Sequence, residues 1–333
     1  MTRVLAVRLD NAGDVLLAGP ALRALAAGAD VTLLCGPRGR PAAELLPGID
    51  EVVSWRAPWI DPEPDRVDPG DVAAAVERVA AVRADIAIVF GSFHQSPLPT
   101  ALVLRLAGVP WIAATTVDYP GSLLDLRHRI DDDVHEVERS LDLVRAAGFD
   151  LPPGDGGELR LATVAPARLD GEYVVVHPGA SQSARAWAPS RHAELVRDLA
   201  AAGRPVMVTG GPAERALTAL VAAADGIDLG GATDFAGLAG VIAGAGAIVV
   251  GNTGPAHLAA AVGTPVVSLY APTVPAVRWR PWRVPHELLG LDVPCAGCRA
   301  RTCPVAGHPC LGGIEVADVV AAVERLAPVG VPA

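Results

Sequence analysis

The chain has 333 residues, 51% of them hydrophobic, and its formal net charge is −10. This length fits two domains that each bury a core, and the apolar content excludes a disordered chain. The acidic balance argues against a general nucleic-acid binder, which needs a basic face, and because all 27 basic residues are Arg, Schiff-base and P-loop chemistry that needs a lysine is excluded as well.

Short β-branched runs alternate along the chain with longer Ala- and Leu-rich stretches. The runs predict strands over residues 4–9, 31–35, 86–90, 173–177, 205–209, 247–251 and 265–270. The longer stretches predict helices over residues 14–27, 71–84, 98–107, 134–147, 190–202, 213–224, 255–262 and 315–326. Strands separated by helices of this length form βαβ units, so we expect an α/β fold whose parallel sheets are covered on both faces.

The alternation breaks at residues 151–157, a Pro- and Gly-rich stretch without periodicity. We therefore expect two Rossmann-like domains, residues 1–155 and 172–312, facing a central cleft, and then a C-terminal helix and tail, 313–333. Ligands of such sheets bind beyond the carboxyl ends of the strands, so functional residues are expected in the loops that follow strands. A Pro- and Asp-rich stretch, residues 58–70, is predicted to be a surface loop.

The first predicted strand runs into a tight turn, Asp10-Asn11-Ala12-Gly13-Asp14, at the start of a helix. Asp14 is a candidate for chemistry at this turn. Alternatively, it is an N-cap or first-turn acid that interacts favourably with the helix dipole. The turn lacks the GxGxxG pattern, so a dinucleotide-binding fingerprint is not supported.

Two loops in the second half carry groups suited to a nucleotide. The strand over 173–177 leads into small residues, Ser181 and Arg185, which are suited to holding a phosphate through backbone amides and a guanidinium. The nearby Trp187 is expected to anchor the core. After the strand over 205–209, a Gly-Gly-Pro turn precedes Glu214, which either accepts hydrogen bonds from ribose hydroxyls or is an ordinary first-turn acid.

A third loop, Asn252-Thr253-Gly254-Pro255-Ala256-His257, gives the strongest local signal. Thr253 is placed to cap the helix, Gly254 permits close backbone approach, and Pro255 fits the first helical turn. The free amides form an anion site, to which His257 adds a donor for a diphosphate. A lone His on an apolar helix is usually a core residue, so His257 gains weight only together with the other loops.

These motifs, taken in order, resemble glycosyltransferase family 9, the heptosyltransferases of lipopolysaccharide core synthesis. The resemblance rests on Asp10-Asn11-Ala12-Gly13-Asp14, on the segment from His177 to Trp187, and on the segment from Thr253 to Ala261. It implies a GT-B architecture, with an amino-terminal acceptor domain, a carboxy-terminal donor domain and an ADP-activated sugar as donor.

The resemblance also implies residue roles. Asp14 corresponds to the general base, and Arg185 stands where many members have a Lys that contacts the donor diphosphate. Asn252 occupies a position often held by Asp, which removes a charge beside the sugar. The implied donor-binding set is Ser181, Arg185, Glu214, Thr233, Asn252, Thr253, Gly254, Pro255 and His257. The implied acceptor-side set is Asp10, Asn11, Gly13, His94 and Gln95, the last two from the loop over 91–96.

We therefore expect a metal-independent, inverting transfer of a sugar, heptose by resemblance, from an ADP donor to a hydroxyl of a glycan or small molecule. Two alternatives remain open. One is a nucleotide-sugar epimerase on the same scaffold, which needs no acceptor site. The other is a non-catalytic sugar-nucleotide-binding module that uses its Cys-rich tail for partner contacts.

The last constellation is Cys295, Cys298, Cys303 and Cys310, with His308 beside them. Four thiols in so short a segment have a spacing that can wrap a structural zinc ion, although it matches no standard finger. The alternatives are free thiols or a disulfide. Catalysis itself is expected to need no cofactor.

The chain is expected to be cytoplasmic. The apolar run after Met1 is too short for a signal peptide, and the Cys usage does not form a secreted disulfide framework. Residues 235–277 carry no acidic or basic side chain except His257, but Gly, Pro and Asn252 interrupt them. This segment is predicted to be a buried strand-loop-helix-strand rather than a transmembrane span. Peripheral association with a membrane surface stays open.

Overall fold

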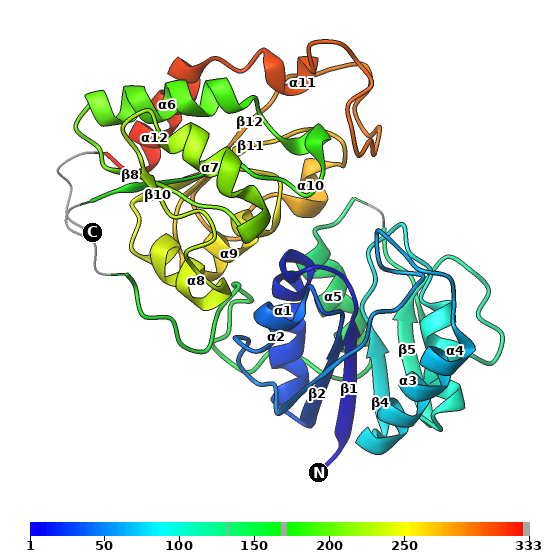
Figure 1. Ribbon diagram of the computed structural model, residues 1–333. Helices are drawn as coiled ribbons and strands as arrows, with labels where there is room; N and C mark the ends of the chain where they lie inside the picture. The colour runs from blue at the N-terminus through cyan, green and yellow to red at the C-terminus, as the bar shows by residue number, and fades with distance from the viewer. Residues whose placement is uncertain (132, 168–171, 329–333) are drawn as a thin grey trace. The chain divides into compact units, whose positions relative to one another are not determined.

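Within residues 1–131, 133–167 and 172–328, which the computed structural model describes, the chain forms two six-stranded parallel sheets (Figure 1). Each sheet belongs to one of two structural units, unit 1 (Met1–Ala162) and unit 2 (Thr163–Ala333). Both sheets have the strand order of a Rossmann fold, in which the first and fourth strands of the unit are neighbours at the centre.

In unit 1 the strand order is β3-β2-β1-β4-β5-β6. The strands are β1 (Arg3–Arg8), β2 (Asp30–Cys35), β3 (Glu51–Ser54), β4 (Ile86–Val89), β5 (Trp111–Thr115) and β6 (Leu126–His128). One face of the sheet is covered by α1 (Ala12–Ala26), α2 (Arg40–Ala43) and α5 (Glu136–Ala146), and the other by α3 (Pro69–Val82) and α4 (Leu98–Leu106) (Figure 1).

In unit 2 the order is β12-β11-β10-β7-β8-β9. The strands are β7 (Val174–His177), β8 (Val206–Val208), β9 (Ile227–Asp228), β10 (Ala247–Gly251), β11 (Val266–Leu269) and β12 (His286–Leu289). Helices α6 (Pro189–Ala201), α7 (Arg215–Ala222) and α12 (Val316–Leu326) pack together, as do α8 (Phe235–Ala243) and α9 (Gly254–Val262). The remaining pieces are short: the 3₁₀ turns η1 (Ser183–Arg185) and η2 (Pro212–Glu214), and the helices α10 (Ala276–Trp279) and α11 (Pro309–Gly312).

The central strands are apolar on both faces, as parallel sheets with helices on either side require. In β1 the residues from Val4 to Val7 are buried, and all of β10 is buried. The expected α/β class with parallel sheets is therefore confirmed, and all seven predicted strands are present. Five further strands, β3, β5, β6, β9 and β12, and four further helices, α2, α8, α10 and α11, were not predicted.

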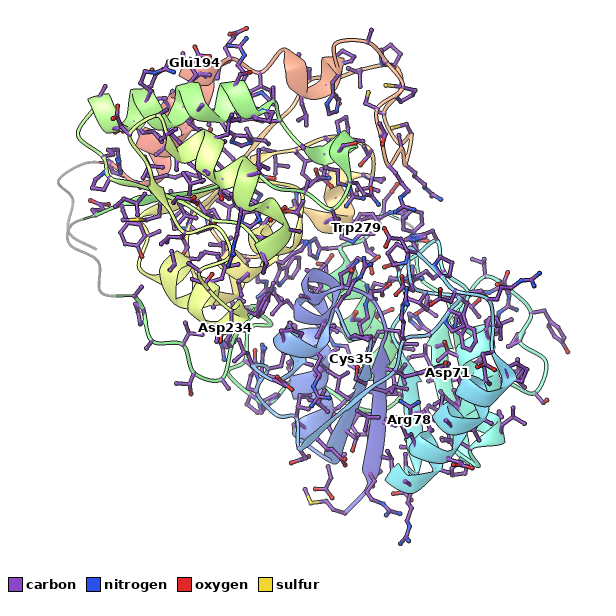
Figure 2. All side chains as sticks on the ribbon, viewed as in Figure 1. Cys35, Asp71, Arg78, Glu194, Asp234 and Trp279 are labelled. Atoms are coloured by element: carbon purple, nitrogen blue, oxygen red, sulfur yellow. The ribbon has the colours of Figure 1, made fainter. Side chains whose placement is uncertain are left out.

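Side-chain caps set two helix starts. α3 begins two residues before the predicted position because the Asp68 carboxylate accepts from the Gly70 N–H and Pro69 occupies the first turn. Farther along α3, Asp71 lies 3.8 Å from the Arg78 guanidinium (Figure 2). The Asp234 carboxylate caps α8 by accepting from the Gly237 N–H at 2.7 Å.

The predicted break is tied to unit 1. Arg23, in the last turn of α1, makes two hydrogen bonds of 2.6 and 2.9 Å to the Asp155 carboxylate and a third to the Glu158 carbonyl. The hydrogen bonds from Arg23 lower the pKa of Asp155 to about 2. Farther on, the Ala162 N–H donates to the Leu45 carbonyl at 2.7 Å. These contacts hold the segment after residue 150 on the α1 side of the sheet.

Candidate functional site

The predicted motifs lie at the carboxyl ends of the central strands in each unit. In unit 1 the loops after β1 and β4 are neighbours, and in unit 2 the loops after β7 and β10 are neighbours. In both sheets this is the point where the strand order reverses, which is where ligands of Rossmann folds bind.

A buried guanidinium organises the unit 1 site. Arg8, the last residue of β1, has a side chain that is 2% exposed. Its Nε lies 2.9 Å from Asp10 Oδ2, its Nη2 donates to Asp14 Oδ1 and to Ser92 Oγ at 3.0 Å each, and its Nη1 lies 3.8 Å from Glu136 Oε2. Three carboxylates thus surround one cation: Asp10 from the loop after β1, Asp14 from α1 and Glu136 from α5.

Burial changes the proton affinity of this cluster. It raises the pKa of Asp10 to about 6, although the charge of Arg8 opposes the rise. It raises the pKa of Glu136 to about 7, again against the charge of Arg8. Burial alone would lower the pKa of Arg8, but the three carboxylate charges outweigh it and raise that pKa.

Asp14 is the carboxylate of the cluster that reaches solvent. Helix α1 begins at Ala12, so Asp14 is a first-turn acid and the N-cap position belongs to Asn11, whose side chain makes no capping bond. The Asp14 side chain is 23% exposed, against 8% for Asp10. Gly13 is buried inside the helix. Asp14 therefore combines accessibility with a fixed hydrogen bond from Arg8.

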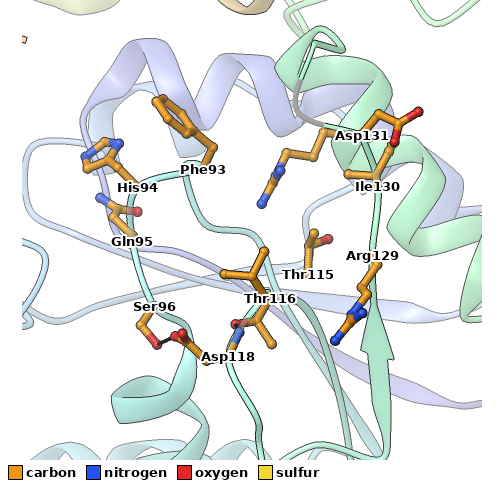
Figure 3. Close-up of a pocket in the computed structure, with 12 residues that line it drawn as sticks. Phe93, His94, Gln95, Ser96, Thr115, Thr116, Asp118, Arg129, Ile130 and Asp131 are labelled. Atoms are coloured by element: carbon orange, nitrogen blue, oxygen red, sulfur yellow. Dashed lines mark hydrogen bonds between the residues drawn. The ribbon is translucent and has the colours of Figure 1, made fainter. Parts of the chain in front are cut away.

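A pocket of about 840 Å³ lies beside this cluster (Figure 3). Phe93, His94 and Gln95 come from the loop after β4, and they lie across the pocket from Arg129 and Asp131, which follow β6 (Figure 3). The other lining residues are Ser96, Thr115, Thr116, Val117, Asp118, Ile130 and Arg139. Both predicted loop residues, His94 and Gln95, are in this wall.

Gln95 connects the pocket to the cluster. Its Nε2 donates to Asp10 Oδ1 at 2.5 Å, and its Oε1 accepts from the Ser92 N–H at 3.1 Å. Opposite ends of one amide are therefore committed, which fixes the side chain between the pocket and the Arg8 cluster. On the floor, Ser96 Oγ donates to Asp118 at 2.8 Å.

In unit 2, Glu214 lies against the loop after β7. Its Oε2 accepts from the Gly211 N–H at 2.7 Å, and a Cβ added to Gly179 would lie 1.9 Å from its Oε1. A larger residue at position 179 would therefore displace this carboxylate. His177 hydrogen-bonds Thr209 Oγ1 at 3.0 Å, and burial lowers the pKa of His177 against the opposing charge of Glu214. The carboxylate thus lies where the loops after β7 and β8 meet.

Arg185 is held over the end of β10. A Cβ on Gly251 would lie 2.7 Å from the Arg185 carbonyl oxygen, so the loop passes directly over this glycine. The Arg185 Nε donates to Thr273 Oγ1 at 3.3 Å. Asn252, the next residue, is buried and bonds Ala271 twice, through its Nδ2 to the carbonyl and through its Oδ1 from the N–H. The two ends of the Asn252 amide therefore join the loops that follow β10 and β11.

The start of α9 differs from expectation in one respect. Thr253 occupies the N-cap position, but its side chain makes no capping hydrogen bond, so the predicted capping role is wrong. Among the described residues, its buried Oγ1 has no hydrogen-bond partner. Leaving a buried hydroxyl without a hydrogen-bond partner costs free energy. The Thr253 hydroxyl lies at the N-terminus of a helix, where anions bind favourably. Gly254 and Pro255 form the first turn, and His257 is buried one turn farther on.

The other predicted donor-side residues lie at the same edge of the sheet. Ser181 is exposed in the loop after β7. Thr233 follows β9 and directly precedes the cap of α8. Trp187 is buried in the core of unit 2, as expected.

The predicted zinc site is not assembled. All four thiols are free, with Cys310 buried in the core of unit 2 and Cys295 and Cys298 exposed. Across the described part of the chain, no three His, Cys, Asp or Glu side chains are arranged to hold a metal ion. The residues as placed do not fit zinc, because one thiol packs among apolar side chains while two face solvent.

The Cys-rich segment instead contacts the loop that carries Arg185. His308 Nε2 donates to the Ala184 carbonyl at 3.0 Å, and the Ala184 N–H donates to the Arg301 carbonyl at 3.0 Å. Ser183 Oγ donates to Thr302 Oγ1 at 3.1 Å. We call residues 299–308 the brace.

Sequence reasoning missed several of these residues. Arg8 and Glu136 carry the unit 1 cluster, and Arg129 and Arg139 line the pocket, yet none of them was among the predicted site residues. Ser92, which bonds Arg8, lies in the predicted loop over 91–96 but was not singled out there. The one available signal was a strand that ends in Arg8, a charged residue in an otherwise apolar run. Such a residue needs a buried partner.

The comparison with protein families decides the identity. A family described as glycosyltransferase family 9 (heptosyltransferase) matches residues 72–308. The chain belongs to glycosyltransferase family 9. The family resemblance stated from the motifs is therefore confirmed.

Individual relatives agree with this family. The chain is 35% identical to lipopolysaccharide heptosyltransferase 1 of Pseudomonas aeruginosa over 176 residues, 51% of this chain and 48% of the relative. It spans about half the length of the curated relatives it matches.

Solved structures show the fold. The Escherichia coli ADP-heptose lps heptosyltransferase II matches with a TM-score of 0.77 and 20% identity over 98% of each chain. Escherichia coli heptosyltransferase WaaC with ADP-2-deoxy-2-fluoro heptose matches with a TM-score of 0.72 and 23% identity, over 97% of this chain and 99% of that one. The chain therefore has the GT-B fold. Among the described residues, no helix is both long and apolar enough to cross a membrane.

Proposed function

We propose that this family 9 chain transfers a heptose from an ADP-activated donor to a hydroxyl of a glycan or small-molecule acceptor, with inversion at the anomeric carbon. The observation that carries the proposal is the arrangement in unit 2. Arg185, Glu214 and the N-terminus of α9, with the Thr253 hydroxyl that has no hydrogen-bond partner among the described residues, lie at the carboxyl ends of β7, β8 and β10.

Each of these groups suits one part of an ADP-sugar. The guanidinium of Arg185 and the α9 amides suit the diphosphate. The Glu214 carboxylate, already oriented by Gly211, suits the ribose hydroxyls. The solved structure of a family relative with an ADP-heptose analogue supports ADP-heptose as the donor.

The unit 1 pocket suits the acceptor. Its wall contains hydrogen-bonding side chains for hydroxyl groups, Asp118 and Asp131 among them, and the Phe93 ring for an apolar face. Two guanidinium groups, Arg129 and Arg139, also line it, which favours an acceptor that bears an acidic group.

Asp14 supplies the base in this proposal. Its carboxylate takes the proton from the acceptor hydroxyl as that oxygen bonds the anomeric carbon. The bond between the anomeric carbon and the phosphate oxygen breaks, and ADP leaves with the electron pair. Arg185 and the α9 amides stabilise the negative charge that develops on the diphosphate. These groups perform the transfer without a metal ion, so we expect the rate to be the same in EDTA.

The test is acceptor-dependent release of ADP. ADP-, UDP- and GDP-sugars are first screened by thermal shift, and the donor that binds is then incubated with candidate acceptors. We expect an ADP-sugar to stabilise the chain and ADP to be released only when an acceptor is present. Release that needs no acceptor would contradict transfer and favour hydrolysis or epimerisation.

Substitution of the base provides the matched control. Asp14→Ala should abolish ADP release while the thermal shift with ADP stays close to that of the wild type, because the nucleotide groups lie in unit 2. Asp30→Ala, an exposed carboxylate at the start of β2, should leave both unchanged. Turnover at the wild-type rate in Asp14→Ala would exclude Asp14 as the base.

A further inference from the structure

The Arg8 cluster holds three carboxylates around one buried guanidinium, and the only other positive charge that faces Glu136 among the described residues is Arg139, so the carboxylates still outnumber the cations. Asp10, Asp14 and Glu136 all contact the same guanidinium, and the side chains of Asp10 and Glu136 are 8% and 2% exposed. Burying ions without compensating partners is strongly unfavourable. The arrangement is therefore most stable when one of the three carboxylates holds a proton.

The contacts of each carboxylate indicate where that proton resides. Asp10 has a 2.9 Å ion pair with Arg8 and a hydrogen bond from Gln95. Asp14 has a 3.0 Å hydrogen bond from Arg8 and partial access to solvent. Glu136 Oε2 is 3.8 Å from Arg8 and has no hydrogen-bond partner within the described residues. Glu136 is the least stabilised as an anion.

We propose that Glu136 is protonated in the resting protein, and that Arg8 and Glu136 are positioning residues that together keep Asp14 ionised and fixed in direction. While Glu136 is neutral, the positive charge of Arg8 pairs only with Asp10 and Asp14 within this cluster. This inference rests on the proposed role of Asp14 as the base.

The titration behaviour agrees with this placement. Burial raises the pKa of Glu136 to about 7, higher than the value of about 6 for Asp10. The charged groups that face Glu136 come from three elements and one loop: Arg8 of β1, Asp10 of the loop that follows, Asp14 of α1 and Arg139 of α5 itself. As the pH rises through about 7, Glu136 loses its proton and becomes a third anion competing for Arg8. We therefore expect kcat to fall above this pH as the hold on Asp14 weakens.

Infrared titration tests the proton directly on the full chain. The wild type should show a carboxylic-acid C=O band at pH 6 that disappears with a midpoint near 7. Glu136→Gln should remove the component with this midpoint and leave any component from Asp10, which titrates near 6. Glu77→Gln, an exposed carboxylate of α3, should leave the component with a midpoint near 7 in place. A band with the same midpoint in Glu136→Gln would overturn the placement of the proton.

Kinetics tests the positioning role separately. Glu136→Ala should lower kcat about tenfold with the donor KM within about twofold, and Glu136→Gln, which mimics the neutral acid, should restore most of kcat at pH 6. The Gln variant should also lose the decline above pH 7. A decline that persists in Glu136→Gln, or a loss of kcat that Gln does not restore, would overturn the role.

The two readouts separate this inference from the proposed function. If the chain releases no ADP with any acceptor, the proposed function fails, but the infrared band still decides the state of Glu136. If ADP is released and the band is not that of Glu136, the inference fails alone.

Discussion

At the scale of single residues, Gly179 shows how the absence of a side chain sets the position of a functional one. The Glu214 carboxylate occupies the space where a Cβ of residue 179 would be, and it also accepts from the Gly211 N–H. The ribose contact proposed for Glu214, in the loop after β8, therefore depends on a glycine in the loop after the neighbouring strand β7.

Gly179→Ala should displace this carboxylate and weaken ADP binding about tenfold, a loss that corresponds to one charged hydrogen bond. The fold should survive, because the obstructing atoms are the end of a flexible side chain. Calorimetric titration with ADP measures the change, and Gly28→Ala, whose Cβ would meet nothing closer than 3.9 Å, is the control. Wild-type affinity in Gly179→Ala would remove Glu214 from the nucleotide site.

Residue types also explain which parts of the site the sequence could predict. Asp14, Arg185, Glu214 and Thr253 lie in loops that follow predicted strands, so local order marked them as candidates, and the family resemblance supplied their roles. Glu136 sits in the first turn of a helix, where an acid is ordinary. Its role depends on contact with Arg8, which lies in a distant part of the sequence, and no spacing rule connects the two.

At the scale of elements, the central strands β1 and β10 were predictable, whereas all four edge strands, β3, β6, β9 and β12, and the interior strand β5 were missed. β1 and β10 are continuous apolar runs, so composition identifies them. β9 has two residues, both exposed, and β12 contains His286 and Glu287 at the edge of its sheet. α8 contains glycines that lower helix propensity, and the Asp234 cap and packing against α9 compensate for them.

The Cys spacing drew attention to the segment that contains the brace, but the structural role of this segment is hydrogen bonding and not the predicted binding of zinc. The predicted metal site is not formed, but the same segment fastens η1 through His308, Arg301 and Thr302. Its bonds go to the N–H and carbonyl of Ala184 and to the Ser183 hydroxyl, directly before Arg185. The brace therefore acts on the loop expected to hold the diphosphate.

His308→Ala should raise the Kd for ADP about fivefold, the effect of one lost hydrogen bond on the placement of Arg185. Adenosine binding should be unchanged, because Glu214 lies on a different loop. Calorimetry with both ligands makes the comparison. His286→Ala is the control. His286 lies in β12 and makes a similar bond to the Val284 carbonyl, and its loss should affect neither ligand. Equal losses for ADP and adenosine would show that the brace serves stability instead.

At the scale of the whole molecule, net charge is a poor guide to the ligand. The chain carries −10 overall and contains no Lys, yet the proposed diphosphate site uses Arg185 and helix amides. An anion responds to the nearest groups, because screening removes the field of charges more than about 10 Å away at moderate salt. The overall composition therefore argued against a nucleic-acid ligand but gave no indication of a nucleotide.

The two units repeat one topology but are assigned different halves of the reaction, and this division can be measured. Hydrogen exchange with and without ADP should show slower exchange in the loops over 178–185, 210–214 and 252–257, by about tenfold or more at saturating ligand. The pocket loops over 92–96 and 115–118 should respond to an acceptor instead. Thr253→Val, which removes the unpartnered hydroxyl, should reduce the ADP effect in all three unit 2 loops. Slower exchange with ADP confined to the pocket loops of unit 1 would reverse the assignment of donor and acceptor.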